Sequence, residues 1–161
     1  MVRSLRDLSN TVRFEDGECC LVADRPTLVI ADDNLKVIEI ACTLLSTAYR
    51  VIKVAIDGEE AMRSIYELRP DFAVLDIYMP KMDGIRVARQ LRLAGLSTRV
   101  VFVTLIDDED YLQEAQSVGF GYVLKRRLTL DLLRALESAR EGLFYCSHCD
   151  STRPSGLYKS A

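Results

Sequence analysis

Several polar side chains in this chain have the types and positions of a chemical site. Asp32, Asp33, Asp76, Thr104 and Lys125 each follow or end a short apolar segment. Carboxylates held close together repel one another, and one of them takes up a proton unless a cation relieves the repulsion. Oxygen ligands that leave room for water and phosphate suit Mg²⁺. These residues therefore predict a magnesium site, provided that the fold brings them together.

The same residues predict phosphoryl chemistry at Asp76. A carboxylate beside bound Mg²⁺ can act as a nucleophile toward phosphorus and form an aspartyl phosphate. In this scheme Thr104 donates a hydrogen bond to one phosphoryl oxygen, and Lys125 supplies a fixed positive charge to another. Taken singly, an aspartate after a strand is usually a helix cap, and a threonine or lysine there is ordinary. Their combination at successive strand ends favours the chemical interpretation.

The elements that must position these residues follow from the spacing of apolar residues. Short apolar or β-branched segments predict strands at 27–31, 50–55, 72–76, 99–104 and 122–125. Apolar residues at three- and four-residue spacing predict helices at 35–45, 61–68, 85–93, 107–118 and 128–142. Strands and helices are thus expected to alternate along the chain.

This alternation predicts an α/β domain built on a parallel sheet. Successive parallel strands need right-handed crossovers, which place helices on both faces of the sheet. The carboxyl ends of all the strands then lie at one edge, where sites form in open α/β sheets. The two aspartates after the first strand, Asp76, Thr104 and Lys125 are therefore expected to converge there.

Length and composition favour one domain with tails. The chain has 161 residues, 49% of them hydrophobic, and a net charge of −3. This balance gives no overall attraction to nucleic acid or to anionic lipid. Its cysteines lack the spacing of a disulfide framework, no export signal is recognisable, and no segment reaches about 18 apolar residues. We expect a cytoplasmic protein without a membrane partner.

Four motifs of the chain resemble those of the receiver domain of bacterial response regulators. They are Asp32-Asp33-Asn34, the run Asp-x-x-Met-Pro-x-Met-Asp-Gly that ends at Gly84, Val103-Thr104, and Gly121-Tyr-Val-Leu-Lys125. The resemblance covers roughly residues 26–143 and is specific in combination. It implies a flavodoxin-like, doubly wound sheet of five parallel strands in the order 2-1-3-4-5, with five helices.

The resemblance implies roles for the acidic residues. Asp76 would accept a phosphoryl group from the phosphohistidine of a sensor histidine kinase or of a phosphotransfer protein. Mg²⁺ would be bound by Asp33, Asp76 and the backbone carbonyl of Tyr78, with Asp32 contributing through water. The domain would be a phosphoacceptor in two-component signal transduction rather than an enzyme.

The resemblance also implies a switch and an output surface. Thr104 would move toward the phosphoryl group, and the ring of Tyr122 would change orientation with it. The resulting shift in population would alter the face formed by helix 107–118, strand 122–125 and helix 128–142. A partner could bind to this face, and a homodimer could form through it or through the first and last helices.

Two departures from the usual receiver pattern have consequences. Arg126 follows Lys125 where many receivers carry a cis proline, as in the NarL/FixJ-type subgroup that usually has a C-terminal helix-turn-helix. We expect a trans peptide here because a non-proline cis bond costs about 2.5–4 kcal/mol. Leu105 stands where the family usually has a small residue. Leu105, Tyr78 and Ile106 are therefore expected to crowd the approach of water and to control access to the phosphoryl group.

The chain divides into an N-terminal extension at 1–25, a receiver domain at 26–143, and a C-terminal tail or truncated linker at 144–161. No helix-turn-helix fits after residue 147, so DNA binding by this chain alone is not expected. Cys146, His148 and Cys149 resemble half of a zinc site, but a closed site needs four ligands. A flexible tail is the favoured interpretation of this segment.

Three alternatives stay open at this point. The chain could be the receiver part of a DNA-binding transcriptional regulator whose helix-turn-helix is missing from it. It could be an aspartyl-phosphate phosphatase of the dehalogenase type, but those enzymes want a second acid where this chain has Tyr78. It could also be a receiver that signals without phosphorylation, against which the complete set of acids, Thr104 and Lys125 argues.

Overall fold

Strands and helices alternate along residues 25–147, the part of the chain that the computed structural model describes. The strands are β1 (Thr27–Ala31), β2 (Arg50–Ala55), β3 (Phe72–Asp76), β4 (Arg99–Thr104), β5 (Gly121–Leu124) and β6 (Tyr145–Cys146). The helices are α1 (Leu35–Leu45), α2 (Gly58–Leu68), α3 (Gly84–Leu93), α4 (Glu109–Val118) and α5 (Leu128–Arg140), and the 3₁₀ turn η1 (Lys125–Arg127) precedes α5. The predicted extension up to residue 24, His148 and Cys149 lie outside the described residues.

Four of the helices begin where the sequence supplies an amide or carboxylate side chain. Each of these side chains accepts a hydrogen bond from a backbone N–H of the first turn, a donor that has no partner within the helix. The capping residues are Asn34 of α1, Asp57 of α2, Asp83 of α3 and Asp108 of α4. All four lie in loops that follow strands, so the caps determine how long each loop is at the carboxyl edge of the sheet.

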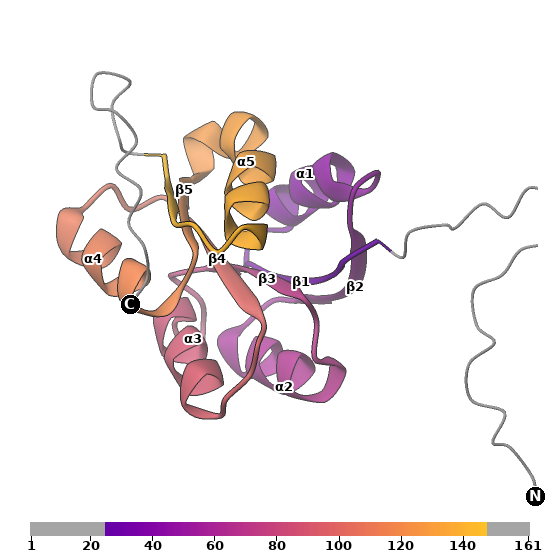
Figure 1. Ribbon diagram of the computed structural model, residues 1–161, viewed down its shortest axis with the longest axis vertical. Coiled ribbons are helices and arrows are strands. Elements are labelled where there is room, and N and C mark those ends of the chain that lie inside the picture. The colour runs from indigo at the N-terminus through magenta and orange to yellow at the C-terminus, as the bar shows by residue number, and fades with distance from the viewer. Residues whose placement is uncertain (1–24, 148–161) are drawn as a thin grey trace, which may run out of the picture.

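The strands form one parallel sheet in the order β2-β1-β3-β4-β5-β6 (Figure 1). The predicted order 2-1-3-4-5 is confirmed, and β6 extends it beyond β5. This strand was not expected because its two residues carry no pattern of their own, and only their pairing with β5 defines it. Lys125 was placed at the end of the fifth strand; it lies instead in η1, directly after β5.

Helices cover both faces of the sheet, as the alternation predicts (Figure 1). One apolar layer contains residues of α1 and α5, and the other contains residues of α2, α3 and α4. β3 is buried along its whole length, and β4 is buried except for its first residue. These central strands are therefore packed from both sides, which fixes the positions of their carboxyl ends.

All peptide bonds among the described residues are trans, including the one between Lys125 and Arg126. The prediction for this bond is confirmed. The chain leaves β5 through η1, in which the N–H of Leu128 donates to the carbonyl of Lys125. The lysine therefore reaches the carboxyl edge of the sheet from a turn of regular geometry.

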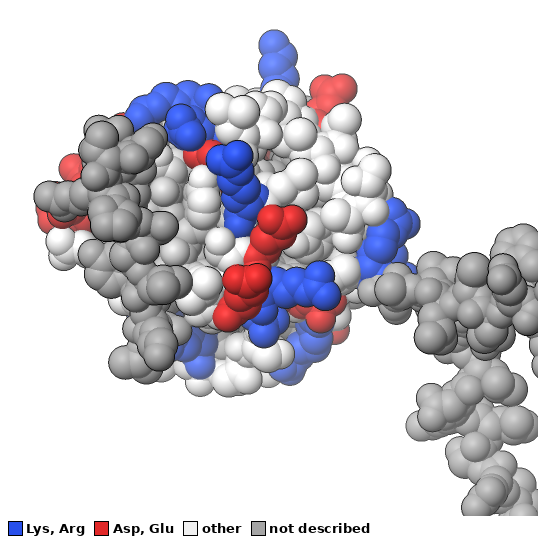
Figure 2. All heavy atoms as spheres, turned by 45° about the horizontal axis from the view of Figure 1, so that its top comes forward, with Lys and Arg blue, Asp and Glu red and all other residues white. Residues whose placement is uncertain are grey.

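The described surface carries no large area of one charge in the view of Figure 2, where acidic and basic side chains lie near one another between uncharged residues. This distribution matches the small net charge of the chain. Between residues 25 and 147, no helix combines the length and the apolar character needed to cross a bilayer.

Candidate functional site

Three carboxylates meet at the carboxyl edge of the sheet. β1 and β3 are neighbours, with Ala31 paired to Leu75, so the residues that follow these partners lie side by side. One ligand oxygen each from Asp32, Asp33 and Asp76 can be chosen so that all lie within 4.8 Å of one another. Asp32 is 2% exposed and Asp76 is 4% exposed, whereas Asp33 faces solvent. The cluster thus has two buried carboxylates and one exposed carboxylate at its mouth.

Lys125 is the cation of this cluster. Its Nζ donates a hydrogen bond to Asp76 Oδ2 at 2.7 Å and lies 2.8 Å from Asp32 Oδ2. Burial lowers the pKa of Lys125, but its contacts with Asp32 and Asp76 outweigh this effect and hold the pKa above its ordinary value. The lysine therefore stays charged, and one ammonium is shared between two buried carboxylates.

The buried carboxylates remain short of positive charge and of donors. Burial raises the pKa of Asp76 and the charge of Asp32 adds to the increase, while Lys125 and a backbone N–H only partly oppose it. Asp32 Oδ2 is buried, and its ion pair is with the ammonium of Lys125, 2.8 Å away, which it shares with Asp76. Buried carboxylate oxygens that share one ammonium beside a third carboxylate fit a divalent cation with oxygen ligands.

The loop after β3 is held close to Asp76 by backbone contacts. The N–H of Tyr78 donates to Asp76 Oδ1 at 3.2 Å, and the N–H of Gly84 donates to the carbonyl of Ile77 at 2.9 Å. A Cβ at Gly84 would lie 2.1 Å from the carbonyl oxygen of Asp76, so no larger residue fits there without a backbone shift. The Asp-Gly that ends the motif is thus required both as the cap of α3 and for this close approach.

Thr104 and Tyr122 are connected by hydrogen bonds through the backbone of Ile106. Thr104 is buried at the end of β4, and its Oγ1 accepts a hydrogen bond from the N–H of Ile106 at 3.1 Å. The carbonyl of Ile106 in turn accepts a hydrogen bond from the hydroxyl of Tyr122 at 2.8 Å. Burial raises the pKa of this phenol, followed by the charge of Asp107. The Tyr122 hydroxyl is therefore a neutral donor at any ordinary pH.

The three residues predicted to control access lie in different surroundings. Leu105 is 77% exposed and Tyr78 is 58% exposed, both in loops that follow strands ending at the site. The Tyr78 hydroxyl is 2.7 Å from that of Tyr111 on α4, so this ring is tied to a neighbouring helix. Ile106 is partly buried and packs against the apolar layer that contains Tyr122.

Two contacts around the site have no signal in the sequence. Tyr111 joins α4 to the loop after β3 through its contact with Tyr78. Lys81 adopts a positive φ of 68° and donates a hydrogen bond to Asp57 Oδ2 at 2.7 Å, which joins the same loop to the start of α2. These pairs are separated by 33 and 24 residues and belong to no motif or period, so only the fold brings them together.

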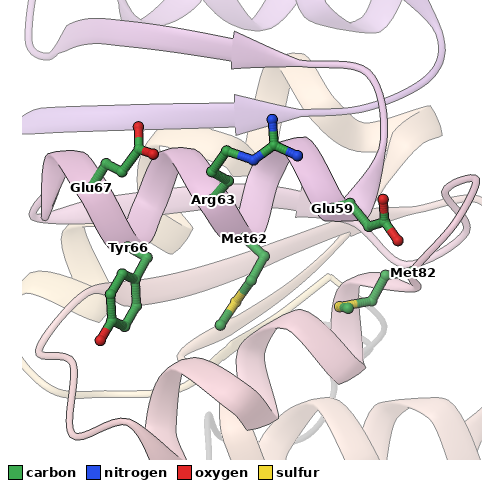
Figure 3. Close-up of a pocket in the computed structure, with 6 residues that line it drawn as sticks. All are labelled: Glu59, Met62, Arg63, Tyr66, Glu67 and Met82. Carbon is green, nitrogen blue, oxygen red and sulfur yellow. The ribbon is translucent and has the colours of Figure 1, made fainter.

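An apolar hollow of about 330 Å³ lies beside this loop and outside the acidic cluster (Figure 3). Most of it is formed by α2, and Met82 extends toward this helix from the loop after β3. Its lining residues are Glu59, Met62, Arg63, Tyr66, Glu67 and Met82, none of which was predicted to belong to the site. The hollow thus does not contribute side chains to the carboxylate cluster.

A family model described as the response regulator receiver domain matches residues 28–137. The chain belongs to this family. A receiver domain is a signalling phosphoacceptor rather than a catalytic enzyme, so the phosphatase alternative is set aside. The acidic cluster of Asp32, Asp33 and Asp76 is consistent with the metal site of such a domain.

Curated relatives of this receiver domain are longer proteins. The uncharacterized transcriptional regulatory protein YvfU of Bacillus subtilis (strain 168) is 33% identical over 118 residues, which are 71% of this chain and 59% of YvfU. The oxygen regulatory protein NreC of Staphylococcus epidermidis is 31% identical over 122 residues, which are 73% of this chain and 56% of NreC. The chain therefore spans less than two thirds of the length of these relatives.

Solved structures place the domain near receivers of the NarL/LuxR type. The receiver domain of the putative response regulator NarL from Mycobacterium tuberculosis superposes with a TM-score of 0.70 at 30% identity, covering 74% of this chain and 98% of that one. A two-component response regulator of the LuxR family from Aurantimonas sp. SI85-9A1 also reaches a TM-score of 0.70, at 27% identity over 75% of this chain and 89% of that one. These structural neighbours agree with the predicted subgroup.

Proposed function

We propose that this receiver acts in two-component signalling and that Asp76 accepts a phosphoryl group from the phosphohistidine of a histidine kinase or a phosphotransfer protein. One observation carries the proposal: Asp76 lies beside two further carboxylates and the ammonium of Lys125 at the carboxyl edge of the sheet. This arrangement combines a nucleophile, oxygen ligands for a cation and a fixed positive charge in one place.

In the proposed transfer, a carboxylate oxygen of Asp76 forms a bond to phosphorus while the phosphorus–nitrogen bond of the donor breaks. The electron pair of that bond passes to the imidazole nitrogen of the donor. Lys125, now paired with Asp76 and Asp32, would turn its ammonium to an incoming phosphoryl oxygen, and Thr104 would donate a hydrogen bond to another. The chain itself thus supplies the nucleophile and two of the groups that stabilise the developing charge.

We propose Mg²⁺ as the cation, held by Asp32, Asp33, Asp76 and the backbone carbonyl of Tyr78. The sharing of one ammonium by Asp32 and Asp76 and the raised pKa of Asp76 support a cation at this position. When bound, Mg²⁺ would neutralise charge on the carboxylates and on the phosphoryl oxygens. Asp33 faces solvent at the mouth of the cluster, where a ligand shared with water is expected.

The proposed output is a change at the surface formed by α4, β5 and α5. A shift of Thr104 toward the phosphoryl group would pull on the N–H of Ile106. The carbonyl of the same residue accepts a hydrogen bond from the hydroxyl of Tyr122. The two hydrogen bonds thus link the phosphoryl site to a residue of β5. Partner binding or homodimer formation would follow at this surface, or at α1 and α5 for a dimer. β6 pairs with β5 and lies at the edge of the sheet. The outer surface at this edge would therefore be formed by α4, β6 and α5.

A second proposal concerns the protein in which this receiver acts. YvfU is described as a transcriptional regulatory protein, and this chain aligns with 59% of it. We therefore infer that the receiver belongs to the class that controls an attached or separate DNA-binding partner. DNA binding would not be a property of residues 25–147, where Lys125-Arg126-Arg127 has two of its basic side chains paired with carboxylates of the domain and the third at the site.

The test is incubation of the chain with acetyl phosphate and Mg²⁺, followed by intact-mass measurement. The wild type is expected to gain the mass of one phosphoryl group, and Asp76→Asn is expected to gain none. Asp110→Asn, a change of an exposed aspartate on α4, is the matched control and should behave as the wild type. No gain in the wild type would contradict the proposed function, while gain in Asp76→Asn at the wild-type rate would show that the acceptor is another residue.

A further inference from the structure

A second buried acid, Asp131, lies outside the acidic cluster. It is fully buried in the first turn of α5. Arg127 donates to it twice, from Nε to Oδ2 at 2.7 Å and from Nη2 to Oδ1 at 3.3 Å. Ser147 Oγ donates to Oδ2 at 2.6 Å. One carboxylate therefore holds side chains from two segments that are 20 residues apart in the chain.

The first of these segments carries the lysine of the site. Arg127 is the last residue of η1, and Lys125 is the first. No side chain caps the start of α5 at Arg127. The two hydrogen bonds from the Arg127 guanidinium to Asp131 join the turn to the helix instead. A paired, bidentate arginine has few alternative positions, so Asp131 restricts the turn from which Lys125 reaches Asp32 and Asp76.

The second segment is the exit from the domain. The N–H of Tyr145 donates to the carbonyl of Phe120 at 3.0 Å, and the N–H of Ser147 donates to the carbonyl of Tyr122 at 2.9 Å. Phe144 packs against one apolar layer of the domain and Tyr145 against the other, so this segment closes the edge of the sheet from both sides. Its last described residue is the one that binds Asp131.

We propose that Asp131 is a positioning residue that joins the Lys125 turn to β6, so that the state of the acidic cluster and the docking of β6 are coupled. The two states of the cluster, with and without a phosphoryl group at Asp76, are those of the proposed function, on which this proposal rests. A buried carboxylate that loses one of its donors is left unsatisfied, which disturbs the donors that remain. Coupling between two sites is reciprocal, so loosening β6 alters the cluster and loading the cluster alters β6.

The coupling has a definite direction. With β6 docked, Ser147, Arg127 and the Tyr145 hydroxyl together satisfy Asp131, and the Lys125 turn is held in place. Loss of the Ser147 donor leaves Asp131 with fewer partners and allows the turn to shift. Lys125 is then less well placed to receive a phosphoryl oxygen, so loading at Asp76 should slow. By reciprocity, a phosphoryl group that engages Lys125 should strengthen the protection of β6.

The experiment uses the full chain and three variants. Ser147→Ala removes one donor to Asp131, Ser147→Thr keeps the hydroxyl, and Ser138→Ala is the matched control on α5. Backbone NMR signals of Asp76 and Lys125, and hydrogen exchange of the Tyr145 amide, are measured without a phosphodonor. Loading by acetyl phosphate with Mg²⁺ is followed by intact mass. We expect Ser147→Ala to shift both NMR signals, to speed Tyr145 exchange about tenfold and to slow loading about threefold.

Rescue distinguishes positioning from simple loss of structure. Ser147→Thr should restore the signals and the loading rate, and Ser138→Ala should leave them unchanged. Faster Tyr145 exchange in Ser147→Ala with unchanged signals of Asp76 and Lys125 would overturn the coupling, because Asp131 would then only anchor β6. A wild type that takes up no phosphate would contradict the proposed function instead, and the NMR signals would still decide the coupling.

Discussion

At the scale of single residues, the site is built on an unequal pairing of charges. Two buried carboxylates, Asp32 and Asp76, share the single ammonium of Lys125. Such an arrangement costs stability in the absence of a further cation, because burial of a charge is only partly offset by one partner. The site without a cation would therefore lower the stability of the folded domain.

Asp76→Asn should stabilise the domain in buffer that contains a chelator. The raised pKa of Asp76 means that the folded state binds its proton more tightly than the unfolded chain does. As the pH rises above about 4, Asp76 loses its proton more readily in the unfolded chain than in the folded one, so the free energy of unfolding falls. This loss is complete above the raised pKa and persists at pH 7. Removing about 1 kcal/mol of this cost would raise Tm by roughly 2–8 °C. Thermal melts of both proteins at pH 7 and near pH 4 test this.

The difference in Tm should shrink as the pH falls toward 4, because the folded wild type then binds the proton at Asp76 and the unfolded chain begins to bind it too. An Asp76→Asn variant that is less stable than the wild type at pH 7 would show that Lys125 fully compensates the buried charge. Asp110→Asn serves again as the control for loss of one exposed negative charge.

Leu105→Ala should shorten the lifetime of the phosphoryl group. Leu105 is 77% exposed in the loop after Thr104, so its side chain is free to lie over the mouth of the cluster. Hydrolysis needs a water in line with the phosphorus–oxygen bond, and a bulky side chain in that line raises the barrier. A rise of about 1.4 kcal/mol corresponds to a tenfold slower loss. The rate of phosphate loss is compared with that of Leu130→Ala, an exposed leucine on α5, and equal rates would remove Leu105 from the mechanism.

At the scale of elements, the loop between β3 and α3 is shaped by close backbone contacts on both sides. Gly84 approaches the carbonyl of Asp76, and a Cβ at Gly58 on α2 would lie 1.8 Å from the carbonyl oxygen of Met82. Lys81 adds an ion pair to Asp57 at the start of α2. The loop is thus held between the strand that carries Asp76 and the neighbouring helix, which keeps the backbone around Tyr78 beside the cluster.

Gly84→Ala should destabilise the domain more than Gly95→Ala. The added Cβ at residue 84 would lie 2.1 Å from a backbone oxygen, and relief requires the strand end to move, at a cost of about 3 kcal/mol or more. At Gly95 no atom lies within 4 Å, and the cost is the positive φ of 69° alone, about 1–2 kcal/mol. Urea unfolding of both variants gives the two values. Equal losses would mean that the close approach at Gly84 does not constrain the loop.

At the scale of the whole molecule, the parallel sheet turns distant residues into neighbours. Asp32, Asp76, Thr104 and Lys125 come from the ends of β1, β3, β4 and β5, and they share one edge because every strand points the same way. Packing of helices on both faces fixes the strands against one another. A cation at this edge would join β1 to β3 and should therefore act on the stability of the fold as a whole.

Mg²⁺ should raise the stability of the wild type and do so less in Asp33→Asn. A ligand that binds only the folded state stabilises it by mass action, by about 2.7 kcal/mol at 100 times its Kd. Asp33 is exposed, so its replacement should leave the metal-free stability nearly unchanged. Thermal melts over a series of Mg²⁺ concentrations, with Asp110→Asn as the control, measure the effect. An equal response of Asp33→Asn and the wild type would exclude Asp33 as a ligand.

Local sequence signals predicted the architecture and the acidic cluster at the carboxyl edge of the sheet. Apolar spacing predicted alternating strands and helices, and the polar residues at strand ends predicted a common edge, because both signals are local and a parallel sheet follows from them. The caps at Asn34, Asp57, Asp83 and Asp108 belong to the same local chemistry. The family resemblance added the strand order, which periodicity alone does not specify.

Side-chain pairs over long separations outside the motifs appear only in the folded protein. Tyr78 meets Tyr111 across 33 residues, and Ser147 meets Asp131 across 16, with no period or motif that relates the members of either pair. β6 likewise exists only through its pairing with β5. The physical reason is that a buried polar group must find a partner wherever packing places one, and packing is a property of all the elements together.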